Sequence, residues 1–211
     1  MSSHRTPDTD PSHTIIQLRE GEVGALADVL ARAFHDEPNF TYMLPDGERR
    51  SKVLPWFFTA AIRAGLRYGK VHTTETTDGG AVWLSPGKRL TFWPMLRTGL
   101  MALPFKFGWE GSRRSLTLNE QLDQVRNELV PEPHWYLMAL GVVPEMQSQG
   151  IGSALIQPIL KRADGEGVPS YLETFSEGAL RFYTRHGFEV RGEGEVPEGP
   201  GFWVMVRDPM T

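Results

Sequence analysis

The chain has 211 residues, of which 22 are Lys or Arg and 26 are Asp or Glu, so its formal net charge is −4. This length corresponds to about one domain, and the 40% share of hydrophobic residues is typical of a globular protein. The absence of cysteine excludes a disulfide scaffold, a cysteine-ligated metal site and a thiol nucleophile. The mild negative charge argues against a broad nucleic-acid-binding face.

No uninterrupted apolar run reaches the roughly 18 residues that a membrane-spanning helix needs. Residues 1–12 are mostly polar and lack the apolar core of a signal peptide, so we expect a loose tail there. A single domain should follow at 13–211, in a cytoplasmic protein without a membrane or nucleic-acid partner, as a monomer or homodimer.

Hydrophobic spacing predicts alternating strands and helices in the first half. The expected elements are a strand at 13–19, a helix at 21–35, a loop between Pro38 and Pro45, a helix at 48–68, a hairpin with strands 70–75 and 81–84, and a helical insert at 90–130 with one or two helices. Pro55 should kink or divide the second helix. The apolar part of the insert, 90–109, could cover a pocket or form a partner surface.

The second half has a clearer pattern. We expect a buried strand at 135–143, a helix at 150–166, a strand at 170–175, a helix at 178–186, and strands at 188–191 and 202–207. Strands and helices that alternate in this way predict an α/β fold.

The segment 142–154 carries the clearest chemical signal, because a buried strand leads through a polar loop into a helix that starts with Gly150 and Gly152. The first amides of a helix have no partner within it, and glycines let an anion approach them. This arrangement suits a diphosphate, although glycine also serves ordinary turns. Leu155 fills the third glycine position of the dinucleotide fingerprint, and no Gly-Lys-Ser/Thr follows as in a P-loop.

With Gln147 included, the pattern Gln-x-x-Gly-x-Gly resembles the acyl-CoA loop of the GNAT N-acetyltransferase superfamily. The preceding Leu140-Gly141-Val142-Val143-Pro144 and the later Phe182-Tyr183-x-x-His186-Gly187-Phe188 are similar to two further segments of that family. The resemblance implies one α/β (α+β) domain with a mixed sheet of six or seven strands, split between the fourth and fifth, and helices on both faces. From 135 to 207 it is closest to puromycin N-acetyltransferase and its relatives, including Pro158 within the helix.

The resemblance divides the chain into an acceptor half, 13–133, and an acyl-CoA half, 134–211. It implies acetyl-CoA as co-substrate and no metal. The residues it assigns to the cofactor are Gly141, Val142, Val143, Gln147, Gln149, Gly150, Ile151, Gly152, Ser153, Ala154 and Ser176. Ser176 stands where the family often has Asn, and a hydroxyl cannot replace both functions of an amide.

Tyr183 resembles the general acid of the family, which protonates the leaving thiolate; its alternative is a core tyrosine. For the general base our first candidate is Glu173, at the end of a strand beside the split, which could instead be structural. His134 and Tyr136 are weaker candidates.

Candidate residues for the acceptor pocket lie in the first two helices and the loop between them. They are Phe34, Glu37, Phe40, Tyr42 and Trp56, with Asp36 and Phe57 beside them. Aromatic walls with a carboxylate suit a bulky amine, although any one of these residues could belong to the core.

The leading interpretation is an acyltransferase that moves acetyl from acetyl-CoA to a primary amine of a small molecule by direct attack in a ternary complex. Without cysteine, an acyl-cysteine intermediate is excluded. The alternatives are an acyl-CoA-binding sensor without turnover, an acetyltransferase for protein or peptide amines, and an unrelated phosphate-binding α/β protein, whose sheet would lack the split.

Overall fold

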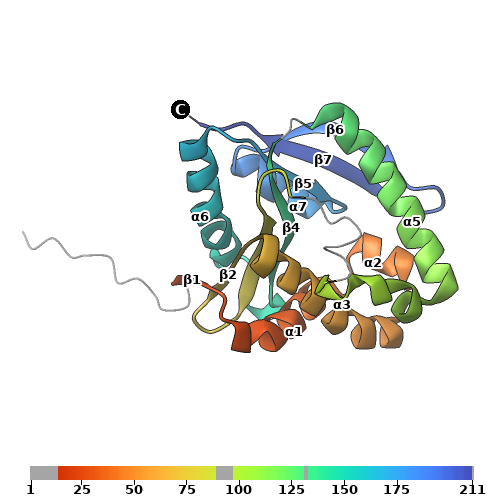
Figure 1. Cartoon of the computed structure of the whole chain (residues 1–211). Helices are drawn as coiled ribbons and strands as arrows, with labels where there is room; N and C mark the ends of the chain where they lie inside the picture. Colours follow the sequence, from red (N-terminus) through yellow and green to blue (C-terminus); the bar gives the residue numbers. More distant parts are fainter. Residues whose placement is uncertain (1–13, 89–96, 131–132, 211) are drawn as a thin grey trace, which may run out of the picture.

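A computed structural model describes residues 14–88, 97–130 and 133–210. Its seven-stranded sheet has the order β1-β2-β3-β4-β5-β7-β6 (Figure 1). The strands are β1 (Ile15–Gln17), β2 (Gly69–Thr74), β3 (Gly79–Leu84), β4 (Trp135–Val142), β5 (Ser170–Thr174), β6 (Glu189–Glu195) and β7 (Gly201–Arg207). The predicted tail, and residues 90–96 of the predicted insert, lie outside the described residues.

The sheet is split between β4 and β5, as predicted. These two strands are parallel, whereas every other neighbouring pair described is antiparallel. Their pairing among the described residues is confined to Trp135 opposite Ser170 and Tyr136 opposite Tyr171, at the start of each strand. β4 also bulges, because Val82 and Trp83 are opposite Ala139 and Leu137 and leave Met138 extra. The later residues of β4 and β5 therefore border an opening in the sheet.

Helices cover both faces of this sheet. One face packs against α1 (Val23–Ala33), α2 (Pro38–Met43), α3 (Gly47–Tyr68) and α5 (Leu103–Leu129), and the other against α6 (Ile151–Glu166) and α7 (Glu177–Arg185). Short 3₁₀ turns precede α1, α5 and α6 at Glu20–Glu22 (η2), Leu100–Ala102 (η3) and Pro144–Met146 (η4). Successive side chains of a strand point to opposite faces of the sheet, so the protein has two hydrophobic cores. Tyr171 of β5 belongs to the core under α1, α2, α3 and α5, and Leu172 to the core under α6 and α7.

Two local predictions from proline were wrong. The expected loop between Pro38 and Pro45 contains α2, which Pro38 begins; its fixed φ suits the first helical turn, where no amide partner is lost. α3 also continues through Pro55, where we expected a kink or boundary. Proline removes one helical hydrogen bond there, and burial of the adjacent Leu54 and Phe58 offsets this loss.

The predicted helical insert forms η3 and the long element α5, which runs beside β6 and β7 (Figure 1). Gly108 divides α5 into two helical segments because its φ of 70° and ψ of 179° are not helical. A Cβ at Gly108 would also lie 2.7 Å from Nη2 of Arg49. The second segment packs against the N-terminal helices, where Leu122 lies near Met43 of α2.

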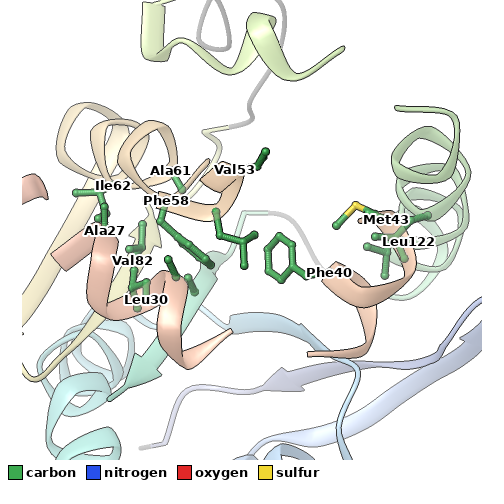
Figure 2. Packing of buried hydrophobic residues seen from close by; sticks show 14 of the residues in the cluster. Ala27, Leu30, Phe40, Met43, Val53, Phe58, Ala61, Ile62, Val82 and Leu122 are labelled. Atoms are coloured by element: carbon green, nitrogen blue, oxygen red, sulfur yellow. The ribbon is translucent and has the colours of Figure 1, made fainter. Parts of the chain in front are cut away.

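A close approach between α1 and β4 positions the N-terminal helices over the split. A Cβ at Gly141 would lie 2.8 Å from Leu30, 3.0 Å from Ala33 and 3.0 Å from Phe34, so only glycine fits without movement. Figure 2 shows Phe40 between the α1–α3 packing around Leu30 and Phe58 and the α2–α5 packing around Met43. This core places the α1–α2 connection beside the opening in the sheet.

Candidate functional site

One cavity of about 1270 Å³ connects the two predicted halves of the site. Gln147, Gly150 and Gly152 line it after β4, and Phe34, Glu37 and Phe40 line it from the first helices. Glu173 of β5 and Tyr183 of α7 also contribute to its wall. The described structure therefore brings the glycine loop, both candidate catalytic residues and part of the predicted acceptor pocket to one space.

The loop between β4 and α6 presents backbone amides to this cavity. Ser148 and Gly150 have φ values of 64° and 85°, in the left-handed region, and turns that expose successive amides form anion-binding concavities. Nε2 of Gln147 donates a hydrogen bond to the carbonyl of Val142 at 3.1 Å and so ties the loop to the strand. Gly150, the N-cap of α6, supplies no capping side chain, so the first amides of the helix stay available.

The space around these amides fits a diphosphate. A Cβ built at Gly150 has no atom within 4 Å, and one at Gly152 meets only the ring of Phe182, at 3.5 Å. Open space, uncapped amides and the positive end of the α6 dipole are what an anionic group needs. The residues present therefore fit the diphosphate of acyl-CoA.

The predicted cofactor residues divide into two groups. Those that line the cavity are Gly141, Val142, Gln147, Gly150, Ile151, Gly152 and Ser153. The others make protein contacts: the amides of Val143 and Ala154 donate to the carbonyls of Asp78 at 2.8 Å and Gly150 at 3.0 Å, Gln149 donates to the carbonyl of Glu145 at 3.4 Å, and the hydroxyl of Ser176 accepts from the amide of Ala179 at 3.4 Å. The Ser176 hydroxyl thus caps α7.

Tyr183 is buried on α7, with 8% of its surface exposed, and contributes to the cavity wall. Its ring lies 5.1 Å from that of Phe182 and 5.7 Å from that of Phe188, both edge to face. Burial, and then the charge of Glu37, raise the pKa of the Tyr183 hydroxyl. Tyr183 is therefore a fixed, protonated hydroxyl at neutral pH, which can donate a proton.

Glu173 lies at the centre of a polar cluster in the same cavity. Tyr171 donates a hydrogen bond to its carboxylate, and Tyr136 adds a second. Burial raises the pKa of Glu173, while these hydrogen bonds and the nearby Arg126 oppose the shift. The ring of His134, which like Tyr136 was a weaker base candidate, packs 5.1 Å from that of Tyr171. Glu173 is thus held in place by two hydroxyl groups.

Glu37 is another cavity-lining carboxylate, and it differs from Glu173 in its contacts. Within the described part of the chain, its carboxylate accepts no hydrogen bond and forms no ion pair. Burial raises the pKa of Glu37, and its charge acts on Tyr183, whereas Glu173 acts on Tyr136 and Tyr171. The two carboxylates therefore occupy different parts of the cavity, and Glu37 is the one coupled to the candidate acid.

Aromatic side chains form much of the acceptor wall. Phe34, Phe40 and Phe57 all contribute to the cavity, with ring centroids 6.1 Å apart for Phe34–Phe40 and 5.3 Å for Phe40–Phe57. Two predicted members lie elsewhere. Tyr42 borders a separate pocket of about 250 Å³ beside Arg114, and Trp56 lies beneath the ammonium of Lys106, 5.9 Å from the ring centroid.

The apolar insert was expected to cover a pocket or form a partner surface, and Leu103 and Phe107 of α5 do line the cavity, but sequence reasoning missed the polar face of the second α5 segment. Ser115, Asn119, Asp123 and Arg126 line the cavity together with Leu118 and Leu122. The polar positions recur every three or four residues, so they lie on one face of the helix. This spacing is visible in the sequence, but nothing in it indicates that the face borders a cavity instead of solvent.

Residues 115–188 match the model of the acetyltransferase (GNAT) family. This match spans the glycine loop and the Tyr183 segment, the two features that the cavity brings together. Residues 115–188 thus belong to a GNAT acetyltransferase domain. An uncharacterised N-acetyltransferase of Schizosaccharomyces pombe is 29% identical over 200 residues, which cover 88% of this chain and 79% of that protein.

Two solved structures share the fold of this GNAT domain. A histone acetyltransferase HPA2-related protein of Corynebacterium glutamicum has a TM-score of 0.64 at 21% identity and covers 94% of this chain and 97% of its own. A polyamine N-acetyltransferase of Drosophila melanogaster has a TM-score of 0.61 at 14% identity and covers 92% and 99%. At these identities the likeness shows the fold.

The described residues form neither a membrane-spanning helix nor a metal-binding cluster. Among the helices at 14–88, 97–130 and 133–210, none is both long and apolar enough to cross a membrane. The same residues contain no group of three or more His, Asp or Glu side chains arranged to hold a metal ion.

Proposed function

We propose that this protein transfers acetyl from acetyl-CoA to the primary amine of a small molecule with an apolar body, by direct attack in a ternary complex. The observation that carries the proposal is the single cavity that joins the amides of the glycine loop to an aromatic wall with the carboxylates of Glu37 and Glu173. Direct transfer is the simplest mechanism, because the chain has no cysteine to form an acyl-thiol intermediate.

Each end of the cavity has a separate role in this proposal. Acetyl-CoA supplies an activated acetyl thioester when bound. The free amides around Gly150 and Gly152 hold its diphosphate, and Tyr183 donates a proton to the departing thiolate. A phenol with a raised pKa remains protonated until the thiolate forms.

The acceptor must lose a proton before its nitrogen can attack, and we assign this step to Glu37. Its carboxylate has no competing partner among the described residues, its pKa is raised by burial, and its charge acts on Tyr183. Glu173, our candidate from the sequence, already accepts hydrogen bonds from two tyrosines, so we propose that it shapes the acceptor end.

The wall predicts the kind of amine that binds. Phe34, Phe40 and Phe57 offer apolar area and ring faces, which favour an ammonium attached to an aromatic or aliphatic body. The carboxylates of Glu37 and Glu173 favour a cation over an anion. The enzyme in the Drosophila structure acts on polyamines, which supports a small amine but does not identify the acceptor of this protein.

The test is release of CoA from acetyl-CoA in the presence of aromatic amines, aliphatic amines, polyamines, aminonucleosides and peptides. We expect turnover with small apolar amines and little with peptides. Turnover with peptides alone would refute the small-molecule acceptor and leave an acetyltransferase. Micromolar binding of acetyl-CoA without turnover of any amine would refute the enzyme and favour a sensor.

A further inference from the structure

A direct contact joins the cofactor helix to the helix that carries the candidate acid. Nε2 of His186, at the C-terminal end of α7, lies 2.9 Å from Oγ of Ser153 in the first turn of α6. Ser153 lines the cavity beside Gly152. The ring of His186 also packs 4.7 Å from that of Phe182, the residue before Tyr183.

We propose that His186 is a positioning residue for the cofactor, and that its contact with Ser153 decides whether the Ser153 hydroxyl donates toward the diphosphate. The inference rests on the proposed function. A serine hydroxyl has one proton to donate, and a neutral imidazole can accept that proton or donate its own. When Nε2 accepts, the hydroxyl turns its lone pairs toward the cavity, where they repel an anion.

Protonation of the imidazole fixes the direction of the hydrogen bond between His186 and Ser153. Both ring nitrogens of a charged histidine are donors, so Nε2 must donate to Oγ of Ser153, and the hydroxyl proton becomes free for a diphosphate oxygen. The added positive charge lies against Ser153 in the first turn of α6 and also favours an anion there. Binding of a diphosphate should therefore be linked to uptake of a proton by His186.

The charged groups around His186 give the starting state of the pair. Burial, and then the charges of Arg185 on α7 and Arg207 on β7, lower the pKa of His186 in the free protein. Nε of Arg207 donates to the carbonyl of His186 at 3.1 Å, and the guanidinium is paired with Asp164 of α6 at 2.7 Å. A diphosphate at the start of α6 offsets these cations, so it should raise the histidine pKa.

The test is the affinity of the full chain for CoA between pH 5.5 and 8.5, measured by calorimetry without an acceptor. In the wild type, CoA should bind more tightly at low pH. In His186→Gln, whose amide can donate or accept but does not titrate, this dependence should fall by about 3- to 10-fold over the range, because one pKa unit of linkage is a factor of ten. Ser153→Ala should reduce it similarly.

Two further measurements make the result decisive. The phosphates of CoA also titrate near neutral pH, but equally with both proteins, so the difference between wild type and His186→Gln isolates the side chain. Pantetheine, which lacks the diphosphate, should show no such difference. The histidine resonance followed by NMR should titrate at higher pH with CoA than without it.

The outcomes separate this inference from the proposed function. Equal pH dependence of CoA affinity in wild type and His186→Gln, or an unchanged histidine pKa on CoA binding, would overturn the role of His186 and leave the enzyme intact. A wild type that binds no CoA at any pH would refute the proposed function itself.

Discussion

The two halves of the cavity are built from different materials. Around Gly150 and Gly152 the wall is backbone: free amides, a strand edge and glycines that leave room for a ligand. At the acceptor end it is side chains, such as Phe34 and Phe40, delivered by α1, α2, α3 and α5. A backbone site depends on local conformation, whereas a side-chain site depends on how distant elements pack. The first can therefore be common to many acetyltransferases while the second sets the acceptor.

The largest effect should come from the residue at the junction of the two halves. Tyr183→Phe removes the proton donor and keeps the ring packing, so kcat should fall by about 10²–10⁴. CoA affinity should stay near that of the wild type, because the diphosphate is held elsewhere. The rate of CoA release measures kcat, and calorimetry measures the affinity for CoA.

Tyr68→Phe is the matched control, since it removes a buried hydroxyl that has no hydrogen-bond partner among the described residues and does not line the cavity. It should turn over like the wild type. If Tyr183→Phe also turned over like the wild type, Tyr183 would be a core residue and not the proton donor.

Substitutions at Glu37 and Glu173 test the roles proposed at the acceptor end of the cavity. Glu37→Gln should lower kcat/KM by about 10²–10³ because the acceptor loses its base. Glu173→Gln should mainly raise KM, since an amide oxygen can still accept hydrogen bonds from Tyr136 and Tyr171. A larger fall in kcat/KM for Glu173→Gln than for Glu37→Gln would assign the role of general base to Glu173.

The pH dependence of kcat/KM tests the role of Glu37 as the base independently. A base works only when deprotonated, so kcat/KM should decline as the pH falls through the pKa of Glu37, which burial raises. In Glu37→Gln the decline assigned to this group should disappear. A profile identical to that of the wild type would exclude Glu37 as the titrating base.

The difference between the halves also explains what the sequence could predict. The glycine loop at 147–152 followed from residues that act through local backbone, so a short motif was enough, and the resemblance carried by that motif implied the split sheet. The acceptor wall followed only in part: Phe34 and Phe40 line the cavity, but Tyr42 and Trp56 turn away from it and Asn119 and Arg126 were missed. Aromatic content marks a core and a pocket equally, and only the packing of α5 separates them. Pro38 and Pro55 misled for a related reason, because proline ends a helix by default but can begin one or be tolerated within one.

The backbone half is tested by filling its free space. Gly152→Val places a branched side chain where the diphosphate should lie, so CoA affinity should fall about tenfold or more, which corresponds to about 1.4 kcal/mol or more. Gly165→Val is the control on the same helix, because a Cβ there has no atom within 4 Å and the residue lies far along the helix from Gly152. Equal loss in both variants would indicate a general effect on α6 and would weaken the assignment of this loop to the cofactor.

The smallest effect concerns the contact that holds the halves together. A Cβ at Gly141 would lie 2.8 Å from Leu30 and 3.0 Å from Phe34, so Gly141→Ala should force α1 away from β4. Overpacking of this kind costs about 1–3 kcal/mol, which denaturant unfolding measures. Gly201→Ala on β7 is the matched strand variant, because its nearest neighbour, the carbonyl of Gly194, is 3.7 Å away; it should unfold like the wild type. Since Phe34 lines the acceptor wall, Gly141→Ala should also raise KM for the amine more than it weakens CoA binding. An equal effect on both ligands would mean that α1 supports the whole cavity, and the two halves could not be varied independently.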